Sequence, residues 1–474
     1  MRTGLAVLEF AILAYFLALN TCYLVFCIVA YVRLRQHRRR WTTRDLDAVM
    51  RSAATPAISI IAPAYNEEET LAESVRSLLL VNYPQFEVIV VSDGSTDRTL
   101  AVGAREFELV PAPVGHAQPI PTQPVRGIYR SLAHPDLVMI DKENGGKADA
   151  INAGINAARY PLVCVIDADS LLEEHSLSRA VLPFIEDPDT IAAGGIVRIA
   201  NGCRVERGRV TEVRLPRSHL AMFQTVEYLR EFLMGRVAQS AVNGLLVISG
   251  AFGLFTREAL VDAGGFRVDT VGEDMELVTR LHRVYRQRRR RFRIVFQPEP
   301  MCWTEVPESV RMLARQRNRW QRGTLDVFRF HAPMLFNPRY GVVGLLVMPF
   351  YFVFEALGPI IEVTGYVVTA LALVFGLLDW RFAELFFLAA IVYGSLLSVT
   401  AVALEELSLR RDGQVSDLMR LAAYGVLEHF GYRQLATWWR MVGVFDYFRR
   451  NEGGTMKRKG FAPPEPAVSR RPAA

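Results

Sequence analysis

The sequence predicts an α/β domain with a mixed, mostly parallel sheet, joined to transmembrane and interfacial helices. Short apolar runs alternate with helical patterns between residues 56 and 200, and long apolar stretches lie near both ends of the chain. Such alternation is typical of a sheet with helices on both faces. Hydrophobic residues make up 51% of the 474 residues, which is high for a purely soluble protein and supports the membrane part of the prediction.

The sheet domain is predicted from its first strands and helices. The predicted strands are 58–62, 86–92 and 162–166, and the predicted helices are 67–80 and 148–158. Ligands of such sheets bind beyond the carboxyl ends of the strands, where the acidic motifs of this chain also lie. A proline-rich insertion at 104–136 interrupts the alternation. We expect this insertion to be a surface segment that takes no part in the reaction.

The N-terminal stretch 5–32 is almost uninterrupted apolar sequence. At about 1.5 Å per residue it is long enough to cross a bilayer. Arginines are concentrated directly after it, at 33–40. The positive-inside rule therefore predicts an external N-terminus and a cytosolic domain.

The C-terminal apolar region predicts two more spans. Residues 385–404 carry no charge and predict one of them. The longer stretch 342–378 contains two prolines together with Glu355 and Glu362, which indicates a broken or re-entrant element followed by one span. Residues 415–447 predict a basic amphipathic region on the inner membrane face. We therefore expect a multi-pass protein of the cell inner (plasma) membrane with three spans.

Charge and cysteine content narrow the classes of partner. The net charge is +6, and the basic residues flank apolar spans without an interleaved aromatic stripe. This pattern predicts membrane lipids as partners and no nucleic acid. The five cysteines lack the paired spacing of metal sites, so we expect reduced cysteines in the core or the membrane.

Four motifs occur in a fixed order ahead of the C-terminal spans. They are Asp93-Gly94-Ser95, Asp167-Ala168-Asp169, Gly272-Glu273-Asp274 and Gln316-Arg317-Asn318-Arg319-Trp320. Over roughly residues 57–405, this ordered set resembles the membrane-integrated family 2 glycosyltransferases, the superfamily of cellulose, hyaluronan, chitin and poly-N-acetylglucosamine synthases. The resemblance implies a cytosolic GT-A domain, the fold of nucleotide-diphospho-sugar transferases. The proline-rich insertion and the single N-terminal span depart from the pattern.

The resemblance implies a set of residues for the nucleotide of the donor. Tyr65, after the first strand, would lie near the uracil. Asp93 would accept the uracil imide proton, although Asp is also a common turn residue. Lys147, in Asn144-Gly145-Gly146-Lys147-Ala148, would meet the diphosphate or the uracil edge at a helix N-terminus, with a solvated lysine as the alternative.

A divalent cation is expected at the second motif. Two carboxylates follow a fully apolar strand there, and Mg²⁺ or Mn²⁺ prefers oxygen ligands, usually only one or two of them from the protein. We expect Asp169 to be the direct ligand. Asp167 is expected to act as its partner toward the sugar or the metal.

The later motifs are assigned to the acceptor and the chemistry. The resemblance implies that Asp274 is the general base, although acidic residues also favour a helix first turn. Gly250 lies in a small-residue turn that would let the acceptor sugar approach the backbone, or that is a plain tight turn. Gln316, Arg319 and Trp320 share one helical face. Trp320 would stack on a sugar and Arg319 would neutralise diphosphate charge, unless they are only a membrane-interface pair.

The implied activity is an inverting transfer from a UDP-sugar, UDP-N-acetylglucosamine or UDP-glucose, that elongates and translocates a β-linked polysaccharide. Within the superfamily, residues 248–251 and 317–320 look closest to bacterial poly-β-1,6-N-acetylglucosamine synthases. The expected partners are the UDP-sugar, a growing glycan or a lipid acceptor, and membrane lipids. A single-transfer glycolipid enzyme and a non-catalytic membrane scaffold remain as alternatives.

The predicted organisation has six parts. They are an N-terminal span and basic linker (1–40), a cytosolic catalytic domain (41–308), interfacial helices with the Gln-x-x-Arg-Trp motif (309–338), re-entrant and transmembrane helices (339–406), an interfacial amphipathic region (407–448) and a disordered basic tail (449–474).

Overall fold

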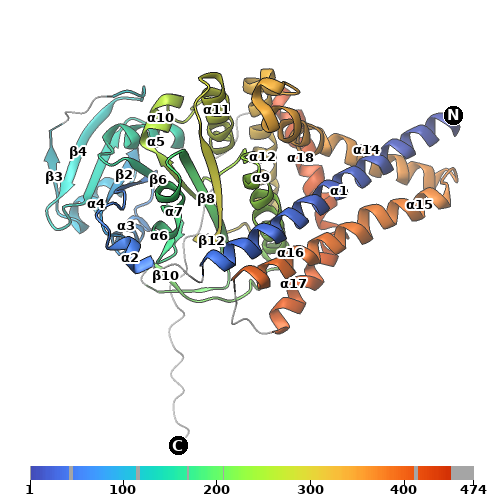
Figure 1. Cartoon of the computed structure of the whole chain (residues 1–474), viewed down its shortest axis with the longest axis horizontal. Coiled ribbons are helices and arrows are strands. Elements are labelled where there is room, and N and C mark those ends of the chain that lie inside the picture. Colours follow the sequence, from blue (N-terminus) through green and yellow to red (C-terminus); the bar gives the residue numbers. More distant parts are fainter. Residues whose placement is uncertain are drawn as a thin grey trace, which may run out of the picture.

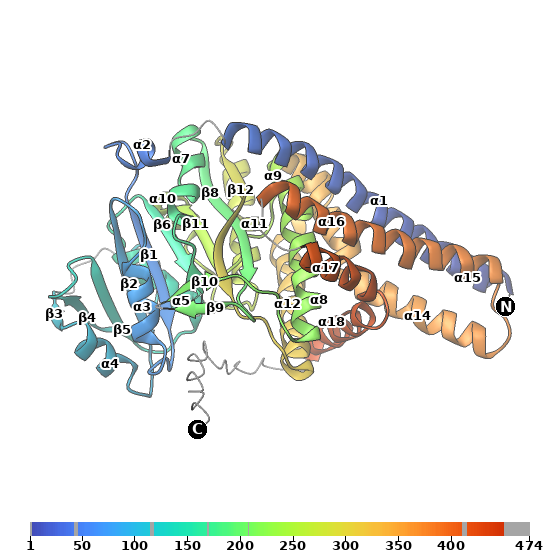
Figure 2. The same ribbon diagram turned by 90° about the horizontal axis from the view of Figure 1, so that it is seen from below.

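The computed structural model describes residues 2–41, 46–113, 118–167, 170–206, 208–409 and 415–449. A sheet domain forms one end of the molecule, and a bundle of long helices extends from it (Figure 1). The N-terminus lies at the far end of this bundle, next to the turn between α14 (Gly358–Val374) and α15 (Trp380–Phe387) (Figures 1 and 2). The first three predicted motifs thus lie in the sheet domain, whereas the fourth lies on α12 (Val310–His331) in the helical part.

A ten-stranded mixed sheet organises the first part, in the order β3-β4-β5-β2-β1-β6-β11-β8-β12-β7. Strands β5, β2, β1 and β6 run parallel at its centre, and β8 pairs parallel with β12. The strands are β1 (Ile58–Ala64), β2 (Phe86–Asp93), β3 (Leu109–Ala112), β4 (Val125–Ser131), β5 (Leu137–Lys142), β6 (Leu162–Ile166), β7 (Leu171–Leu172), β8 (Thr190–Ile199), β11 (Phe252–Thr256) and β12 (Arg293–Thr304), with β9 (Arg204–Glu206) and β10 (Arg209–Glu212) forming a separate hairpin.

Helices cover the sheet and connect its strands. They are α2 (Leu46–Met50), α3 (Leu71–Leu79), α4 (Thr99–Glu106), α5 (Lys147–Ala157), α6 (Ser176–Ala180), α7 (Leu182–Glu186), α8 (His219–Leu229), the π-helix η1 (Arg230–Arg236), α9 (Val237–Ala241), α10 (Arg257–Ala263) and α11 (Glu273–Gln287). The prediction of a mixed, mostly parallel sheet is confirmed, because most paired residues lie in parallel pairings.

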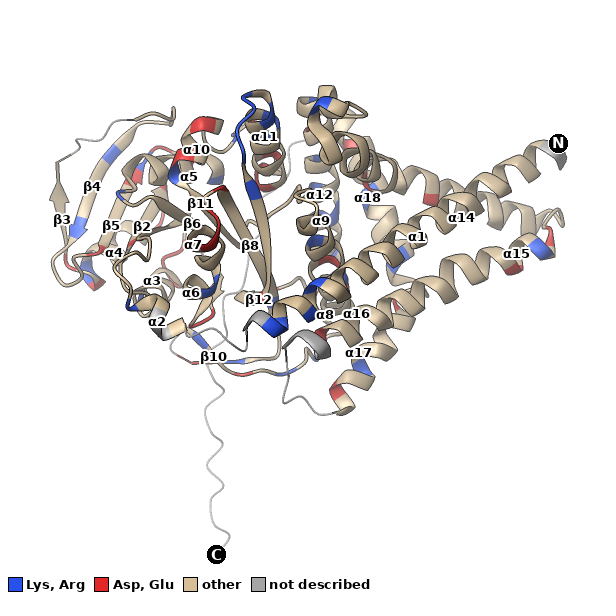
Figure 3. Ribbon diagram, viewed as in Figure 1, with Lys and Arg blue, Asp and Glu red and all other residues tan. Residues whose placement is uncertain are grey.

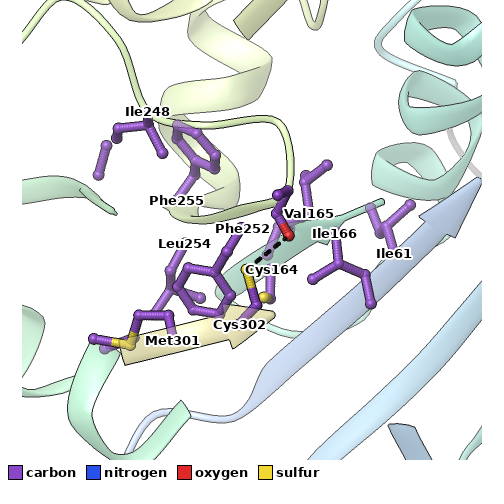
Figure 4. Close-up of a cluster of buried hydrophobic side chains, with 14 of the residues drawn as sticks. Ile61, Cys164, Val165, Ile166, Ile248, Phe252, Leu254, Phe255, Met301 and Cys302 are labelled. Carbon is purple, nitrogen blue, oxygen red and sulfur yellow. Dashed lines mark hydrogen bonds between the residues drawn. The ribbon is translucent and has the colours of Figure 1, made fainter. Parts of the chain in front are cut away.

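The core lies between the central strands and their covering helices. Strand β6 is buried along its whole length, as continuous apolar sequence predicts for a strand covered on both faces. Figure 4 shows β6 residues packing beside Phe252 and Leu254 of β11 and Met301 of β12. Cys302 Sγ lies 3.6 Å from the carbonyl oxygen of Ala251 in the same cluster. This rigid centre carries the loops that follow β2, β5 and β6.

The helical part consists of α1 (Arg2–Trp41) and the elements after β12. These are α12 (Val310–His331), η2 (Ala332–Met334), η3 (Pro338–Tyr340), η4 (Val343–Val347), α13 (Met348–Phe350), η5 (Tyr351–Ala356), α14, α15, η6 (Leu388–Val392), α16 (Tyr393–Leu409), α17 (Val415–Leu427) and α18 (Tyr432–Arg449). Charged side chains are sparse along α1, α14 and α15–α16 compared with the sheet domain (Figure 3).

Two helical segments are long and apolar enough to cross a membrane, Gly4–Arg39 and Trp380–Glu405. A third candidate is the pair Val343–Ala356 and Gly358–Val374, which bends by 42° at Leu357. Pro359 follows this break directly, so its ring fits the first turn of the second helix. The broken element expected between 342 and 378 is therefore present, and the carboxylates inside it are both hydrogen-bonded.

These two carboxylates bind side chains of other helices. Glu355 accepts from Arg440 of α18 at 2.8 Å. Glu362 accepts from Tyr15 of α1 at 3.2 Å and from Thr437 at 3.0 Å. Unpaired carboxylates are costly in an apolar environment, and these contacts satisfy both of them. The same contacts connect the broken element to α1 and α18.

Some local predictions differ from the structure. The first helix begins at Leu71 rather than Glu67, because the backbone N–H of Glu67 donates to Thr99 Oγ1 at 2.8 Å and Asn66 has a positive φ of 56°. The proline-rich insertion is not only a surface segment, because it contributes β3 and β4 to the sheet. The predicted disordered tail 450–474 lies outside the described residues.

Candidate active site

Asp93 ends β2 and holds the turn that leads into α5. Its carboxylate accepts from the backbone N–H groups of Gly145 at 3.0 Å and Gly146 at 2.7 Å. The side chain of Asn144 donates to the Asp93 carbonyl at 2.8 Å. Gly146 has a φ of +86°, which a residue with a Cβ rarely adopts. Asp93 is thus only 3% exposed and anchors the turn 144–146, directly before Lys147. Its predicted role toward uracil stays a prediction.

Lys142, the last residue of β5, also binds Asp93. Its Nζ lies 2.6 Å from Asp93 Oδ1 and 2.5 Å from Asp149 Oδ2, and the lysine side chain has no exposed surface. Sequence reasoning missed both Lys142 and Asp149. A lysine at a strand end is usually solvated, and its partners lie on β2 and α5, so no local pattern indicates this buried ion triad.

Lys147 is the first residue of α5 and meets carboxylates from two other motifs. Its Nζ lies 2.5 Å from Asp167 Oδ1 and 3.3 Å from Glu273 Oε1. Burial alone would lower the pKa of Lys147, but Asp167, Glu273 and Asp274 raise it above its usual range. The lysine is therefore a fixed positive charge at the carboxyl end of the parallel strands.

Asp274 begins α11 beside the same lysine. One carboxylate oxygen accepts from Met275 N at 2.8 Å and the other from Gly250 N at 3.2 Å. A Cβ on Gly250 would lie 2.9 Å from Lys147 Nζ, so a larger residue here would displace the lysine side chain. Burial raises the pKa of Asp274, and the Glu273 carboxylate raises it further, while Lys147 opposes both. A carboxylate with a raised pKa is a better proton acceptor than a solvated one.

Arg236 is a further cation on this side of the site. It ends the π-helix η1, and its guanidinium contributes to the electrostatic field at Asp274. Its Nε and Nη1 are buried and have no hydrogen-bond partner within the described part of the chain, while its Cζ lies 4.1 Å from the ring centroid of Phe232. Sequence reasoning did not select this residue, and the π-helix around it, a feature often found at functional sites, has no sequence signature.

The Gln-x-x-Arg-Trp motif lies on α12, which packs against α11. Gly323, seven residues after Gln316, touches Gly272 so closely that a Cβ on Gly272 would lie 2.8 Å from Gly323 Cα. Gln316 is buried, whereas Trp320 is 41% exposed and lies 4.5 Å from the guanidinium carbon of Arg317. The motif face is thus held next to the start of the helix that carries Asp274.

For two predicted donor-site residues the structure does not test the predicted role. Tyr65 follows β1 and is 45% exposed. Asp169 lies outside the described residues, so its role as metal ligand stays a prediction. Among the residues that are described, no group of three or more His, Cys, Asp or Glu side chains is arranged to hold a metal ion. Mg²⁺ commonly takes only one or two of its oxygen ligands from the protein, so Asp167 could contribute to such a site without a larger cluster.

The predicted motifs therefore converge, even though they are distant in sequence. Lys147, Asp167, Gly250 and Asp274 meet at one point. Gln316, Arg319 and Trp320 lie on α12, whose Gly323 contacts Gly272, two residues before Asp274. Three carboxylates, those of Asp167, Glu273 and Asp274, act on the Lys147 ammonium. They outnumber the Lys147 and Arg236 cations of the site by one, and this excess of negative charge fits an additional cation.

Comparisons with known proteins agree with this geometry. Residues 59–108 match the family described as "Glycosyl transferase family 2", and residues 123–323 match "Glycosyltransferase like family 2". The poly-β-1,6-N-acetyl-D-glucosamine synthases of Staphylococcus aureus (strain COL) and Staphylococcus epidermidis are each 30% identical to the chain over 271 residues, 57% of this chain. The chain spans about half of the length of these relatives, 55% of each.

A solved structure shares the fold. The mannosyltransferase of Pyrobaculum calidifontis, determined with GDP-mannose and Mn²⁺, aligns with a TM-score of 0.50 and 19% identity, covering 93% of this chain and all of that one. At this identity the likeness concerns the fold alone, which is that of GT-A enzymes. The match over residues 123–323 contains Lys147, Asp167, Gly250 and Asp274, the residues that converge at the site, and the chain therefore carries a glycosyltransferase family 2 domain, matched over residues 59–108 and 123–323.

Proposed function

We propose that the chain is a membrane-attached, inverting glycosyltransferase that transfers a sugar from UDP-N-acetylglucosamine or UDP-glucose to a growing β-linked polysaccharide. The observation that carries this proposal is the convergence of Lys147, Asp167 and Asp274 at one point, from motifs that lie up to 127 residues apart in sequence. The likeness to the staphylococcal poly-β-1,6-N-acetyl-D-glucosamine synthases favours an N-acetylglucosamine donor and a polymer product.

Asp274 is the proposed general base. Its carboxylate would take the proton of the acceptor hydroxyl as that oxygen attacks the anomeric carbon and the bond to UDP breaks. The N–H groups of Gly250 and Met275 hold the two carboxylate oxygens in place. Direct attack by the acceptor inverts the anomeric carbon, so an α-linked donor gives a β-linked product.

Lys147 is the proposed electrostatic partner of the departing UDP. Its ammonium is fixed between carboxylates and would meet diphosphate charge as that charge develops. Asp167, together with Asp169, would hold Mg²⁺ or Mn²⁺, and the bound cation would neutralise diphosphate oxygens. Arg319 would add positive charge from α12. Tyr65 and Asp93 would contact the uracil.

The acceptor would approach along α12. Trp320 is exposed enough to stack on a sugar ring, at about 0.5–1.5 kcal/mol beyond area burial. The apolar helices, with up to three spans, would keep the domain at the cytosolic face of the inner membrane and let the product pass through the same chain.

The test uses purified full-length protein in sealed vesicles, with radiolabelled UDP-sugars added on the side of the sheet domain. We expect UDP release, a product of many sugars, and accumulation of that product inside, protected from added glycosidase. Trp320→Ala should shorten the product more than it weakens UDP binding. Trp380→Ala, at an exposed position on α15, is the matched tryptophan control and should leave product length unchanged.

Two outcomes would contradict the proposal. A lipid carrying one or two sugars, left on the UDP side, would instead identify a single-transfer glycolipid enzyme. Absence of UDP release with every UDP-sugar tested would remove the assigned donor class.

A further inference from the structure

Lys142 carries a fully buried charge that the proposed chemistry does not use. Its side chain has no exposed surface, and its two carboxylate partners, Asp93 and Asp149, are 4% and 7% exposed. A buried ammonium is costly unless it is paired and hydrogen-bonded. This triad of one lysine and two aspartates therefore needs a structural reason, and its contacts supply one.

On one side the triad fixes the turn before Lys147. Asp93 binds the N–H groups of Gly145 and Gly146, which directly precede Lys147. Gly94, directly after Asp93, packs closely against this turn, since a Cβ on Gly94 would lie 2.6 Å from Asn144 N. The position of the Lys147 backbone therefore depends on the position of Asp93.

On the other side the triad fixes helix α5, whose first residue is Lys147. Asp149 approaches Gly145 so closely that a Cβ on Gly145 would lie 2.4 Å from Asp149 Oδ2. Asp149 also accepts from the backbone N–H of Gln123, at 3.1 and 3.2 Å to its two oxygens. The segment around Gln123, in the proline-rich insertion, thereby contacts the same carboxylate that binds Lys142.

Two asparagines on the same face of α5 continue this attachment. Asn156 binds both backbone groups of Ile120, at 3.2 and 2.8 Å. Asn152 binds both backbone groups of Phe266, at 2.7 and 2.8 Å. Because Asp149, Asn152 and Asn156 lie at i, i+3 and i+7, one helix face holds the insertion and the loop after α10. Residues 120–123, in the middle of the proline-rich insertion, are thus part of the support of α5.

We infer that Lys142 and Asp149 are positioning residues that set the place of Lys147 in the donor site, and that the insertion supports them through Gln123. The inference rests on the proposed function, since it assigns Lys147 to the diphosphate of the donor. Neither residue touches the reacting atoms. Each acts through the turn 144–146, and the chain of contacts from Gln123 through Asp149, Lys142 and Asp93 to Gly146 is continuous.

A second buried carboxylate on the same strand offers a matched control. Glu87, at the amino end of β2, accepts from Ser59 Oγ at 2.6 Å and from the backbone N–H and Nε of Arg159 at 2.8 and 2.7 Å. It is as buried as Asp149 and also binds a charged partner and a backbone group. It lies at the opposite end of the strand from the Lys147 turn.

The experiment compares Asp149→Asn with Glu87→Gln in the full-length protein in lipid nanodiscs. For each variant we would measure the melting temperature, the Kd for UDP by calorimetric titration, and KM and kcat for UDP-N-acetylglucosamine. Both variants should lower the melting temperature. Only Asp149→Asn should raise the Kd for UDP and the donor KM, by about 10-fold, as for other residues that orient a binding group.

A double variant covers the case in which Asp149→Asn does not fold. Lys142→Met with Asp149→Asn removes one positive and one negative charge and so keeps the net charge of the triad. It should raise the Kd for UDP by at least as much. UDP affinity equal to wild type in either folded variant would overturn the inference.

Lys147→Ala separates this inference from the proposed function. If the wild type binds no UDP-sugar, both fail together. If UDP binding is lost in Lys147→Ala but is unaffected by changes at Lys142 and Asp149, the positioning role alone is wrong.

Discussion

The two ends of strand β2 each carry a buried carboxylate, and the two ends differ in what surrounds it. At the amino end, Glu87 binds Ser59 and Arg159, and the arginine side chain is 43% exposed to solvent. At the carboxyl end, Asp93 binds Lys142, which is fully buried, and two backbone N–H groups of the turn before Lys147. Both carboxylates fix a loop, but only the second loop leads to further charged groups.

The difference lies in charge balance. Around Glu87 one carboxylate meets one guanidinium, and the remaining contacts are neutral. Beyond Asp93, three carboxylates meet two cations, the Lys147 ammonium and the Arg236 guanidinium, and burial raises the pKa of one of these carboxylates, Asp274. At the amino end of β2 the charges of neighbouring side chains are matched, and such an arrangement stabilises the fold. At the carboxyl end negative charge is in excess, and such an excess favours binding of an added cation or a proton.

The largest effect should come from removing the cation. Excess EDTA should abolish turnover, and Mg²⁺ or Mn²⁺ should restore it, because the excess of carboxylates at the carboxyl end then lacks its counter-charge. The measurement is UDP release before and after metal is added back. Undiminished turnover in EDTA would mean that the carboxylates are balanced without a metal ion. The amino and carboxyl ends of β2 would then be more alike than we propose.

Asp274→Asn should lower turnover by about 10²–10⁴-fold, because the amide keeps the shape but cannot accept the proton. The Kd for UDP should change little. The melting temperature should stay the same or rise, since a buried carboxylate with a raised pKa is unfavourable in its charged form. Calorimetric titration with UDP provides the control, and a parallel loss of UDP affinity would make Asp274 a binding or metal residue.

The pH dependence of turnover should report the raised pKa of Asp274. The base works only when deprotonated, so turnover should fall as the pH drops through that pKa. Because the Glu273 carboxylate raises the pKa of Asp274, Glu273→Gln should move the acid limb of the rate profile to lower pH. Protonation of Asp274 also stabilises the folded state at low pH, and this stabilisation is lost as pH rises through the folded-state pKa. An acid limb that does not move would exclude Asp274 as the group that titrates.

The smallest effect should come from the amino end of β8. Asp187 accepts from the N–H of Asp189 and from Arg293, each at 3.0 Å, and these bonds hold its pKa below the usual range. Asp187→Asn should lower the free energy of unfolding by about 0.2–1 kcal/mol and leave turnover unchanged. The charged form stabilises the fold above the unfolded-state pKa, and this is lost as pH falls through the folded-state pKa. Denaturant melts at pH 7 and at low pH would therefore differ between variant and wild type only at pH 7.

Much of the sheet could be predicted from the sequence because its central strands are continuous apolar runs. The predicted strand 162–166 matches β6, and the predicted helix 148–158 matches α5 to within one residue at each end. The motifs after these elements also meet as expected, because the carboxyl ends of parallel strands share one edge of the sheet. Local pattern and topology were sufficient for this part of the site.

The buried triad could not be predicted in the same way. Lys142 binds Asp93 across 49 residues, and a lysine at a strand end has the same local sequence whether it is buried or solvated. The start of the first helix was missed for a similar reason, since Thr99, the first residue of α4 and 32 residues away, accepts the N–H of Glu67. Burial of a polar side chain depends on its tertiary partners, which periodicity does not contain.

The contact between Gly272 and Gly323 sets a limit on how this enzyme can diversify. Helix α12 touches the start of α11 through these two glycines and touches α18 on another side, where a Cβ on Gly443 would lie 2.9 Å from the carbonyl oxygen of Asn318. Neither contact has room for a methyl group. The spacing between α11, which carries Asp274, and α12, which carries Trp320, is therefore fixed. We expect new acceptor preferences to arise by exchanging side chains around Trp320 rather than by shifting α12.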